Sequence, residues 1–164
     1  MKISKRGEYG VRALCHLADR HGQGLTHIRE IADSEDLPCK FLEGILLALK
    51  RAGFVKSRRG NEGGYALARD PATVMLGDVL RALDGPLAPM ASASELTAMM
   101  ERHPDRRGFY AVLLKVRNAV AEILDHTSIA EISNSGEADL VGSDAGLHQY
   151  VRGATVAVHH FEVE

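Results

Sequence analysis

Two arginines and three glycines lie close together in residues 52–69, A-G-F-V-K-S-R-R-G-N-E-G-G-Y-A-L-A-R, and form the part of the chain best suited to contact a polyanion. They are Arg58, Arg59, Gly60, Gly63 and Gly64. Glycine permits the positive φ of a tight turn, and a guanidinium can donate to phosphates and base edges. β-compatible runs flank them: Phe54, Val55 and Ser57 before, and Tyr65, Ala66 and Leu67 after. The pattern predicts a hairpin with a basic tip, either a DNA-binding wing or a solvated hairpin whose charge is incidental.

A helix is predicted immediately before this hairpin, between Pro38 and Gly53, which are typical of a helix start and of a position just past a helix end. Its apolar residues recur at a spacing of three and four: Leu42, Ile45, Leu46 and Leu49. The opposite face carries Lys40, Glu43, Gly44, Leu47, Lys50 and Arg51, with Phe41 at the boundary. We expect this face to be exposed.

A shorter helix precedes the turn D-L-P, with Thr26 as its expected cap and Ile28, Ile31 and Ala32 facing inward. Two helices joined by a tight turn and followed by a hairpin predict a winged helix-turn-helix. A first helix is expected after Ser4, with an inward stripe of Val11, Leu14, Cys15 and Ala18. Lys5 and Arg6 lie in its first turn, where they either bind a phosphate or keep the surface soluble.

Net charge supports a nucleic-acid partner once its distribution is considered. The whole chain of 164 residues has a formal charge of −2. Residues 1–70 contain 13 Lys and Arg against 9 Asp and Glu, a balance of +4, and the remaining 94 residues carry −6. The basic segment is the one that contains the predicted wing, as expected for a DNA-binding module.

Composition excludes several other classes of protein. No apolar run approaches the roughly 20 residues that span a bilayer, and the N-terminus lacks a signal-like apolar stretch, so we expect a cytoplasmic protein without a membrane partner. Two cysteines, Cys15 and Cys39, are too few for a disulfide framework and form no C-x-x-C pair. No P-loop lysine follows the glycine-rich loop, and no nucleophile, base and orienting acid stand together, which predicts that the chain is not an enzyme.

The predicted fold class is therefore mainly α with a small β-hairpin. Residues 1–86 form the winged domain, which a helix with Leu76, Val79, Leu80 and Leu83 closes before Gly85 and Pro86. Residues 87–107 are expected to be a linker or sensing loop with one helical turn at 95–101. Residues 127–164 form a tail of unknown role, in which the adjacent His159 and His160 are a poor metal chelate on a strand.

A long helix is predicted over residues 108–126. Its apolar seam has spacings of four, three, four and three: Phe109, Leu113, Val116, Val120 and Ile123. Such a seam either dimerises the protein or packs against its own domain. We favour a homodimer, because one winged module reads few bases and two-fold symmetry doubles the site.

These segments together resemble the Rrf2 family of winged-helix transcriptional regulators. The resemblance rests on M-K-I-S-K-R-G-E-Y-G-V-R-A-L, I-R-E-I-A, the helix and hairpin from P-C-K-F-L to A-L-A-R, L-G-D-V-L-R-A-L-D-G-P-L and I-L-D-H-T-S-I-A-E-I. It covers residues 1–132 and implies a homodimeric repressor or activator that binds double-stranded DNA.

The resemblance also implies which residues contact DNA. The recognition helix of the family enters the major groove, and the matching positions are Cys39, Lys40, Phe41, Glu43 and Gly44. Glu43 would accept from a cytosine amino group, and Lys40 would reach a guanine or a phosphate. Arg59 would enter the minor groove, while Arg6, Arg58 and Tyr65 would contact or support the DNA backbone.

The signal that controls the protein is left open by the sequence. Cluster-binding relatives carry three cysteines in the sensing loop, and residues 88–107 have none, so the usual iron–sulfur cluster is not expected and the cofactor is unknown. An unusual set drawn from Glu8, Cys15, His16 and His103 stays an alternative. Others are a small-molecule effector, docking to a metabolic enzyme, and a redox switch at Cys39, which begins the recognition helix.

Overall fold

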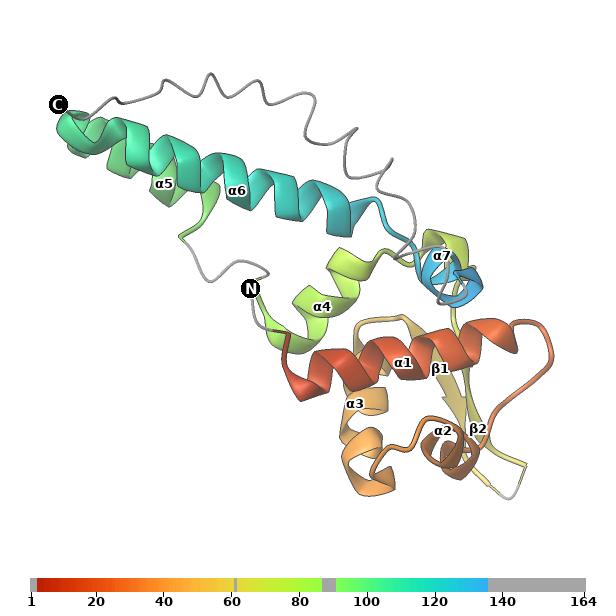
Figure 1. The fold of residues 1–164 in the computed structure, drawn as a ribbon. Helices are drawn as coiled ribbons and strands as arrows, with labels where there is room; N and C mark the ends of the chain where they lie inside the picture. The colour runs from red at the N-terminus through yellow and green to blue at the C-terminus, as the bar shows by residue number, and fades with distance from the viewer. Residues whose placement is uncertain (1–2, 61, 87–90, 136–164) are drawn as a thin grey trace, which may run out of the picture. The chain divides into compact units, whose positions relative to one another are not determined.

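A computed structural model describes residues 3–60, 62–86 and 91–135. Its elements in chain order are α1 (Lys5–Asp19), α2 (Ile28–Ser34), α3 (Cys39–Arg51), β1 (Val55–Arg58), β2 (Gly64–Leu67), the 3₁₀ turn η1 (Pro71–Thr73), α4 (Leu76–Asp84), α5 (Ala93–Arg102), the 3₁₀ turn η2 (Pro104–Arg106), α6 (Arg107–Asp125) and α7 (Ile129–Asn134) (Figure 1). β1 and β2 pair antiparallel, from Val55 opposite Leu67 to Arg58 opposite Gly64. The predicted fold class, mainly helical with one small hairpin, is confirmed.

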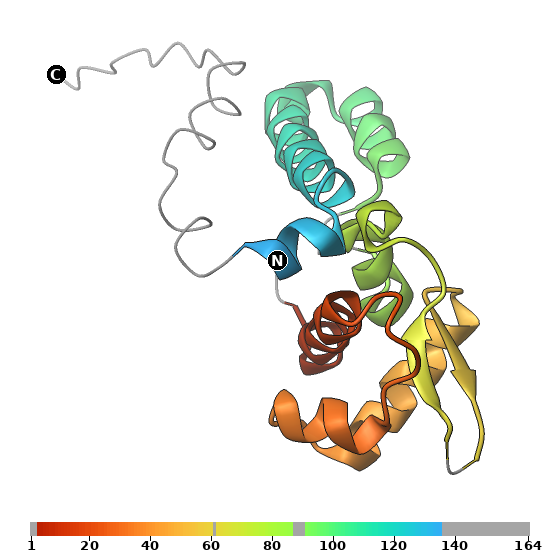
Figure 2. The same cartoon turned by 90° about the vertical axis from the view of Figure 1, so that its right-hand side faces the viewer.

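The core forms where α1, α3 and α4 meet the base of the hairpin (Figure 2). The predicted inward stripe of α3 is confirmed, since Leu42, Ile45, Leu46 and Leu49 are almost completely buried. Each such side chain contributes about 1.5–3 kcal/mol through burial. One face of α3 is therefore committed to the core, and the other is left exposed.

The ends of these helices follow the predicted signals. The Ser4 hydroxyl accepts from the Gly7 amide at 3.0 Å and so caps α1, and it donates to the Asp84 carboxylate at 2.5 Å. The second bond ties the start of α1 to the end of α4. α3 begins directly after Pro38, and Gly53 leaves the helix end with a φ of 78°, which favours glycine.

The prediction that Thr26 caps α2 is wrong. The cap position belongs to His27, which makes no side-chain capping bond. Thr26 is buried and pairs instead with Tyr65 as an isolated antiparallel bridge. Thr26 thus extends the hairpin by a single backbone pairing on the free edge of β2 and supports the wing rather than α2.

The inward stripe predicted for the first helix packs against the core, but it is not the most deeply buried side of that helix. Leu14 is fully buried, but Val11, Cys15 and Ala18 are only half-buried. The buried side of α1 is centred instead on Ala13, Leu14 and Leu17. The reason is that α1 packs on α4 as well as α3, and at Gly10 the approach is so close that a Cβ would overlap the side chain of Leu83.

α5 is longer than the single turn predicted within the linker. Ser92 and Glu95 form a capping box at its start, and their bonds lower the pKa of the Glu95 carboxyl. Leu96 is buried, and α5 lies beside α6 in Figures 1 and 2. Residues 87–90 of the predicted linker lie outside the described residues.

The chain after residue 126 differs from the predicted tail at its beginning. Ser128 and Glu131 start the helix α7, and Ile129 is fully buried in the core of the winged domain. The Ile129 amide donates to the Val74 carbonyl at 2.8 Å. Residues 136–164, which include the predicted strand with His159 and His160, are not among those described.

None of the helices within residues 3–60, 62–86 and 91–135 has both the length and the apolar character needed to cross a bilayer.

Candidate nucleic-acid interface

The exposed face of α3 carries the side chains that the sequence assigns to base contacts. Lys40, Phe41, Glu43 and Gly44 are exposed, and Cys39 is half-buried against the core. Within the described parts of the chain, Lys40 and Glu43 have no hydrogen-bond or ion-pair partner. Both charged groups are therefore available to an external ligand. The space around Gly44 is open, since a Cβ there would meet nothing within 4 Å.

Phe41 is exposed but held in place by a neighbouring aromatic ring. Its side chain is 46% exposed, and its ring lies edge-on to Tyr9 of α1 with centroids 5.8 Å apart. The Tyr9 ring also lies under the Lys5 ammonium, at 5.6 Å, and near the Arg12 guanidinium, at 6.0 Å. These contacts fix where Phe41 points and join the start of α1 to the start of α3.

The two arginines of the wing have different surroundings. The Arg58 guanidinium donates to the Glu62 carbonyl at 2.9 Å and so closes the wing from within. Arg59 is exposed and has no partner among the described residues. Gly63 makes the tight turn possible, because a Cβ at this position would overlap the Arg58 carbonyl. Arg59 is therefore the free cation of the wing tip, and Arg58 supports it.

The wing is fastened to the helix-turn-helix at two points. Lys50 of α3 donates to the Ser57 hydroxyl of β1 at 2.8 Å. On the other strand, the amide and carbonyl of Tyr65 pair with Thr26, and the Tyr65 side chain is half-buried against the core. Tyr65 thus lies in a supporting position. These roles of Thr26 and Lys50 were not predicted, since neither a strand-like bridge of one residue nor a helix-to-strand contact leaves a periodic signal in the sequence.

The first turn of α1 presents one free and one paired cation. Lys5 forms an ion pair with Glu8 at 2.9 Å, which raises the pKa of the lysine. Arg6 is exposed, and no group in the described chain pairs with it. Only Arg6 of the two is therefore unpaired at this end of the helix.

The turn between α2 and α3 is braced by a partly buried polar cluster that was not predicted from the sequence. Arg12 donates to the backbone carbonyl of Glu35, and its Nε lies 3.4 Å from the Glu35 carboxylate. The buried His16 ring lies 3.4 Å from the same carboxylate through Nδ1. These contacts hold the end of α2, where the turn into α3 begins, against α1.

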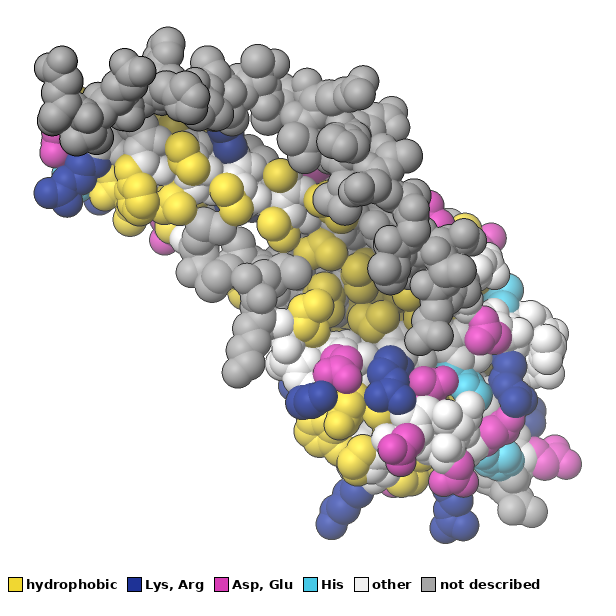
Figure 3. Space-filling model, in the orientation of Figure 1, with side chains coloured by type: hydrophobic (Ala, Val, Ile, Leu, Met, Phe, Trp, Pro, Cys, Tyr) yellow, Lys and Arg dark blue, Asp and Glu magenta, His cyan; other side chains and the backbone are white. Residues whose placement is uncertain are grey.

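α6 exposes a row of apolar side chains (Figure 3). Phe109, Val116 and Ile123 of the predicted seam are 61%, 46% and 42% exposed, while Leu113 and Val120 are half-buried. Val112, which the sequence analysis did not include, is 58% exposed. The exposed positions, including Ala119, thus have spacings of three, four, three and four, and α6 packs against α5 elsewhere on its surface.

A three-helix core, an exposed recognition helix and an anchored basic wing define a winged helix-turn-helix protein that binds DNA. Comparison with known proteins gives the family. The model of the Rrf2 family, described as an iron-dependent transcriptional regulator, matches residues 3–135. The chain belongs to the Rrf2 family and is a DNA-binding transcriptional regulator.

Similar proteins include regulators with solved structures. The HTH-type transcriptional regulator CymR of Bacillus subtilis (strain 168) is 35% identical over 134 residues, which are 82% of this chain and 91% of CymR. The structure of CymR, the global cysteine regulator of B. subtilis, superposes with a TM-score of 0.69 at 34% identity, covering 84% of this chain and 99% of that one. The structure of IscR of T. potens superposes with a TM-score of 0.63 at 34% identity, covering 85% of this chain and 91% of that one.

The residues of this chain do not fit an iron–sulfur cluster held by three cysteines. The whole sequence has two cysteines, so three thiolates cannot be supplied. Burial, with added repulsion from Asp19 and Glu35, raises the pKa of the Cys15 thiol to about 11 and favours the protonated form. In the described ranges, no three His, Cys, Asp or Glu side chains are gathered as metal ligands, and this includes the set of Glu8, Cys15, His16 and His103.

Proposed function

We propose that the protein binds operator DNA as a homodimer, with α3 in the major groove and the wing tip in the minor groove. The observation that carries the proposal is the contrast between free and engaged charges. In the described chain, Lys40, Glu43 and Arg59 lack partners, whereas Lys50 and Arg58 are used inside the domain. Unpaired charges at these positions are the groups that DNA would satisfy.

The first turns of α3 have the chemistry to read base edges. The Glu43 carboxylate can accept from a cytosine amino group, and Lys40 can donate to a guanine or a phosphate. The Phe41 ring, fixed by Tyr9, offers an apolar surface to a thymine methyl group. Gly44 leaves room for the DNA to approach the helix backbone. The half-buried Cys39 would lie at the edge of this contact.

The wing supplies a cation to the minor groove. A guanidinium is attracted by the enhanced negative potential of a narrow A·T-rich groove. Arg59 is the residue proposed for this role, with Arg58 and Tyr65 as supports. Arg6 at the start of α1 is proposed to contact a phosphate, which a helix N-terminus also favours.

A second copy of the chain is the proposed occupant of the apolar face of α6. The face follows the three-and-four spacing by which two helices pair, and its exposed members are large apolar side chains. A two-fold dimer would present two recognition helices to successive half-sites on one side of the duplex. Phe109, Val116 and Ile123 are the proposed central contacts, with Leu113 and Val120 at the margin.

Replacement of the wing arginine tests the proposal. We expect Arg59→Ala to weaken binding of a selected operator duplex by about ten- to a hundredfold, as loss of a groove contact typically costs 1–3 kcal/mol. Arg102→Ala removes the same charge from α5 and should leave affinity unchanged within about twofold. Equal effects of the two variants in fluorescence anisotropy titrations would refute the assigned site.

The effector is proposed to be something other than a cluster, because the thiolates are lacking. A small ligand, a thiol signal or a docked protein remains for this role. Purification of the native protein from its own cells separates docking from the other two: a stoichiometric protein partner supports control by docking, and its absence supports a small ligand or a thiol signal.

A further inference from the structure

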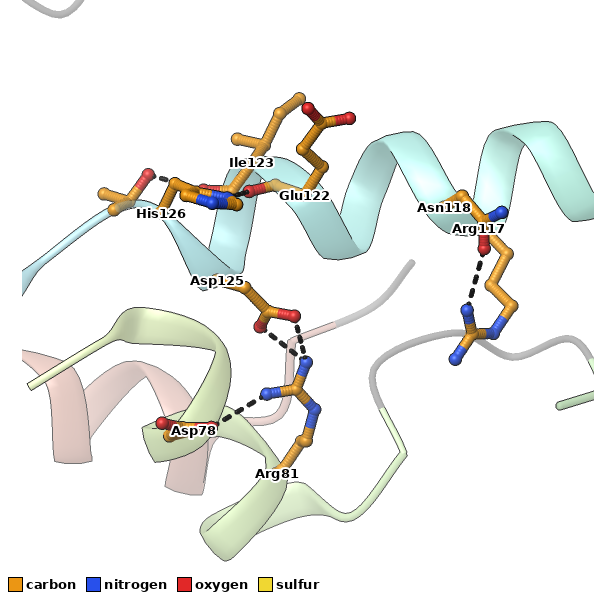
Figure 4. A network of polar contacts seen from close by, with 9 residues as sticks. Asp78, Arg81, Arg117, Asn118, Glu122, Ile123, Asp125 and His126 are labelled. Atoms are coloured by element: carbon orange, nitrogen blue, oxygen red, sulfur yellow. Dashed lines mark hydrogen bonds and ion pairs between the residues drawn. The ribbon is translucent and has the colours of Figure 1, made fainter. Parts of the chain in front are cut away.

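The C-terminus of α6 is joined to the winged unit by a compact set of polar contacts. Arg81 of α4 donates to both carboxylate oxygens of Asp125, at 2.7 Å for Oδ2, and its other terminal nitrogen bonds Asp78 at 3.0 Å (Figure 4). Asp125 is the last residue of α6, where a negative charge is unfavourable to the helix dipole. The guanidinium offsets that charge and links the two helices through its Nη2, while the other arm of its planar fork binds Asp78 within α4.

Gly77 allows this approach. A Cβ there would overlap Asp125 Oδ1 and would lie 3.2 Å from an Arg81 nitrogen and from the Leu124 backbone. Leu124 is itself buried. At Gly77 the backbone of α4 therefore lies directly against Asp125 and Leu124 at the end of α6.

The backbone after α6 is fixed to the same place. The Leu76 amide donates to the Thr127 carbonyl, and the Ile129 amide donates to the Val74 carbonyl, each at 2.8 Å. Met75 and Ser128 form an antiparallel bridge between these bonds. The helix thus meets the winged unit at a joint, defined here as Gly77, Arg81 and Asp125 together with this bridge.

We infer that the joint sets the spacing of the DNA half-sites, with Arg81 and Asp125 as positioning residues that contact no DNA themselves. The inference rests on the proposed dimerisation through α6. If two copies pair along α6, the direction in which α6 leaves the winged unit determines the separation of the two recognition helices. A loosened joint lets each winged unit pivot, so that half-sites at other separations become acceptable.

The test compares full-length variants on a series of operators. Operators are first selected by the wild type from random duplexes, and their half-sites are then moved apart or together by one and two base pairs. Asp125→Asn keeps the shape but removes the charge, and Arg81→Lys keeps the charge but removes the fork. Asp78→Asn is the matched control, since it breaks an ion pair of the same arginine but leaves the bridge to α6.

Wild type and Asp78→Asn should prefer the selected spacing by about tenfold or more, the scale of losing favourable contacts at one half-site. Asp125→Asn should reduce this preference to about threefold or less, and Arg81→Lys should lie between, while light scattering and thermal unfolding show folded dimers. An Asp125→Asn/Arg81→Lys double variant should be no less selective than Asp125→Asn, because both act on one contact.

An unchanged spacing preference in both single variants overturns the inference. Only variants that thermal unfolding shows to be folded are compared, so Arg81→Lys alone provides the test if Asp125→Asn does not fold. A wild type that is monomeric, or that shows no spacing preference, refutes the proposed dimeric binding and this inference with it. If the wild type is dimeric and selective for spacing and the variants are equally selective, the inference about the joint is refuted and the proposed dimeric binding stands.

Discussion

The backbone of Thr26 is paired with that of Tyr65, with N–O distances of 2.8 and 2.9 Å in the two directions. Thr26 lies just before α2, and Tyr65 lies in the second strand of the wing. The wing is thereby attached to the segment that leads into the helix-turn-helix. Because β2 is held between β1 and Thr26, the direction of the wing is fixed at its base.

Gly64 makes this pairing possible, and its replacement should disturb the wing. A Cβ at Gly64 would lie 2.5 Å from the Thr26 carbonyl oxygen. We expect Gly64→Ala to lower the free energy of unfolding by about 1–3 kcal/mol through overpacking and to weaken operator binding. Urea unfolding and anisotropy titrations measure the two effects. Gly108→Ala, in open space on α6, is the control, and equal stability of the two variants would contradict the steric argument.

Gly44 should respond in the opposite direction for stability. Glycine inside a helix costs about 0.5–1 kcal/mol relative to alanine, and a Cβ at Gly44 has free space, so Gly44→Ala should stabilise the free protein by that amount. If α3 lies against DNA, the added methyl should nevertheless reduce operator affinity. A variant that is more stable and binds as tightly as wild type would show that DNA does not approach this position.

The two cysteines should differ in their effect on DNA binding after oxidation. Cys15 has a thiol pKa of about 11, so at neutral pH it is protonated, and the reactive thiolate forms only as the pH rises toward that value. Cys39 begins α3 beside the proposed interface. We expect peroxide to weaken operator binding of wild type and Cys15→Ser alike, and to leave Cys39→Ser unaffected. Persistent peroxide sensitivity in Cys39→Ser would exclude a switch at this thiol.

Protein purified without oxygen should be colourless. With two cysteines in the sequence, one of them a half-buried and protonated thiol, the ligands of a three-cysteine cluster are lacking. An absorption spectrum and iron analysis on the fresh protein test this. Visible bands together with stoichiometric iron would contradict the account of a cluster-free regulator.

The sequence was sufficient for the helices and the wing wherever one local signal dominated. The apolar spacing of α3 and the glycines around Arg59 are such signals, and both gave the correct elements. Thr26 was misassigned because a threonine before a helix is an ordinary cap, and its pairing with Tyr65 depends on a contact across the fold. Non-local pairing of that kind has no periodicity along the chain.

The same limit explains the C-terminal part. α6 has more apolar residues than one helical stripe needs, and which of them stay exposed depends on the packing of other helices against α6, so Val112 was not predicted. Ile129 looked like part of a tail because its partners in the core are far away in sequence. Arg81 and Asp125 are 44 residues apart, and the joint they form became visible only in the structure.

Selection of random DNA duplexes by the wild-type protein tests the central claim most directly. The account predicts that the enriched sequences are two-fold symmetric, that they bind a dimer, and that their affinity falls steeply with salt, with a log–log slope of about −0.9 per phosphate contacted. Enrichment of no sequence over random duplex, or of a single unrepeated half-site bound by a monomer, would contradict it.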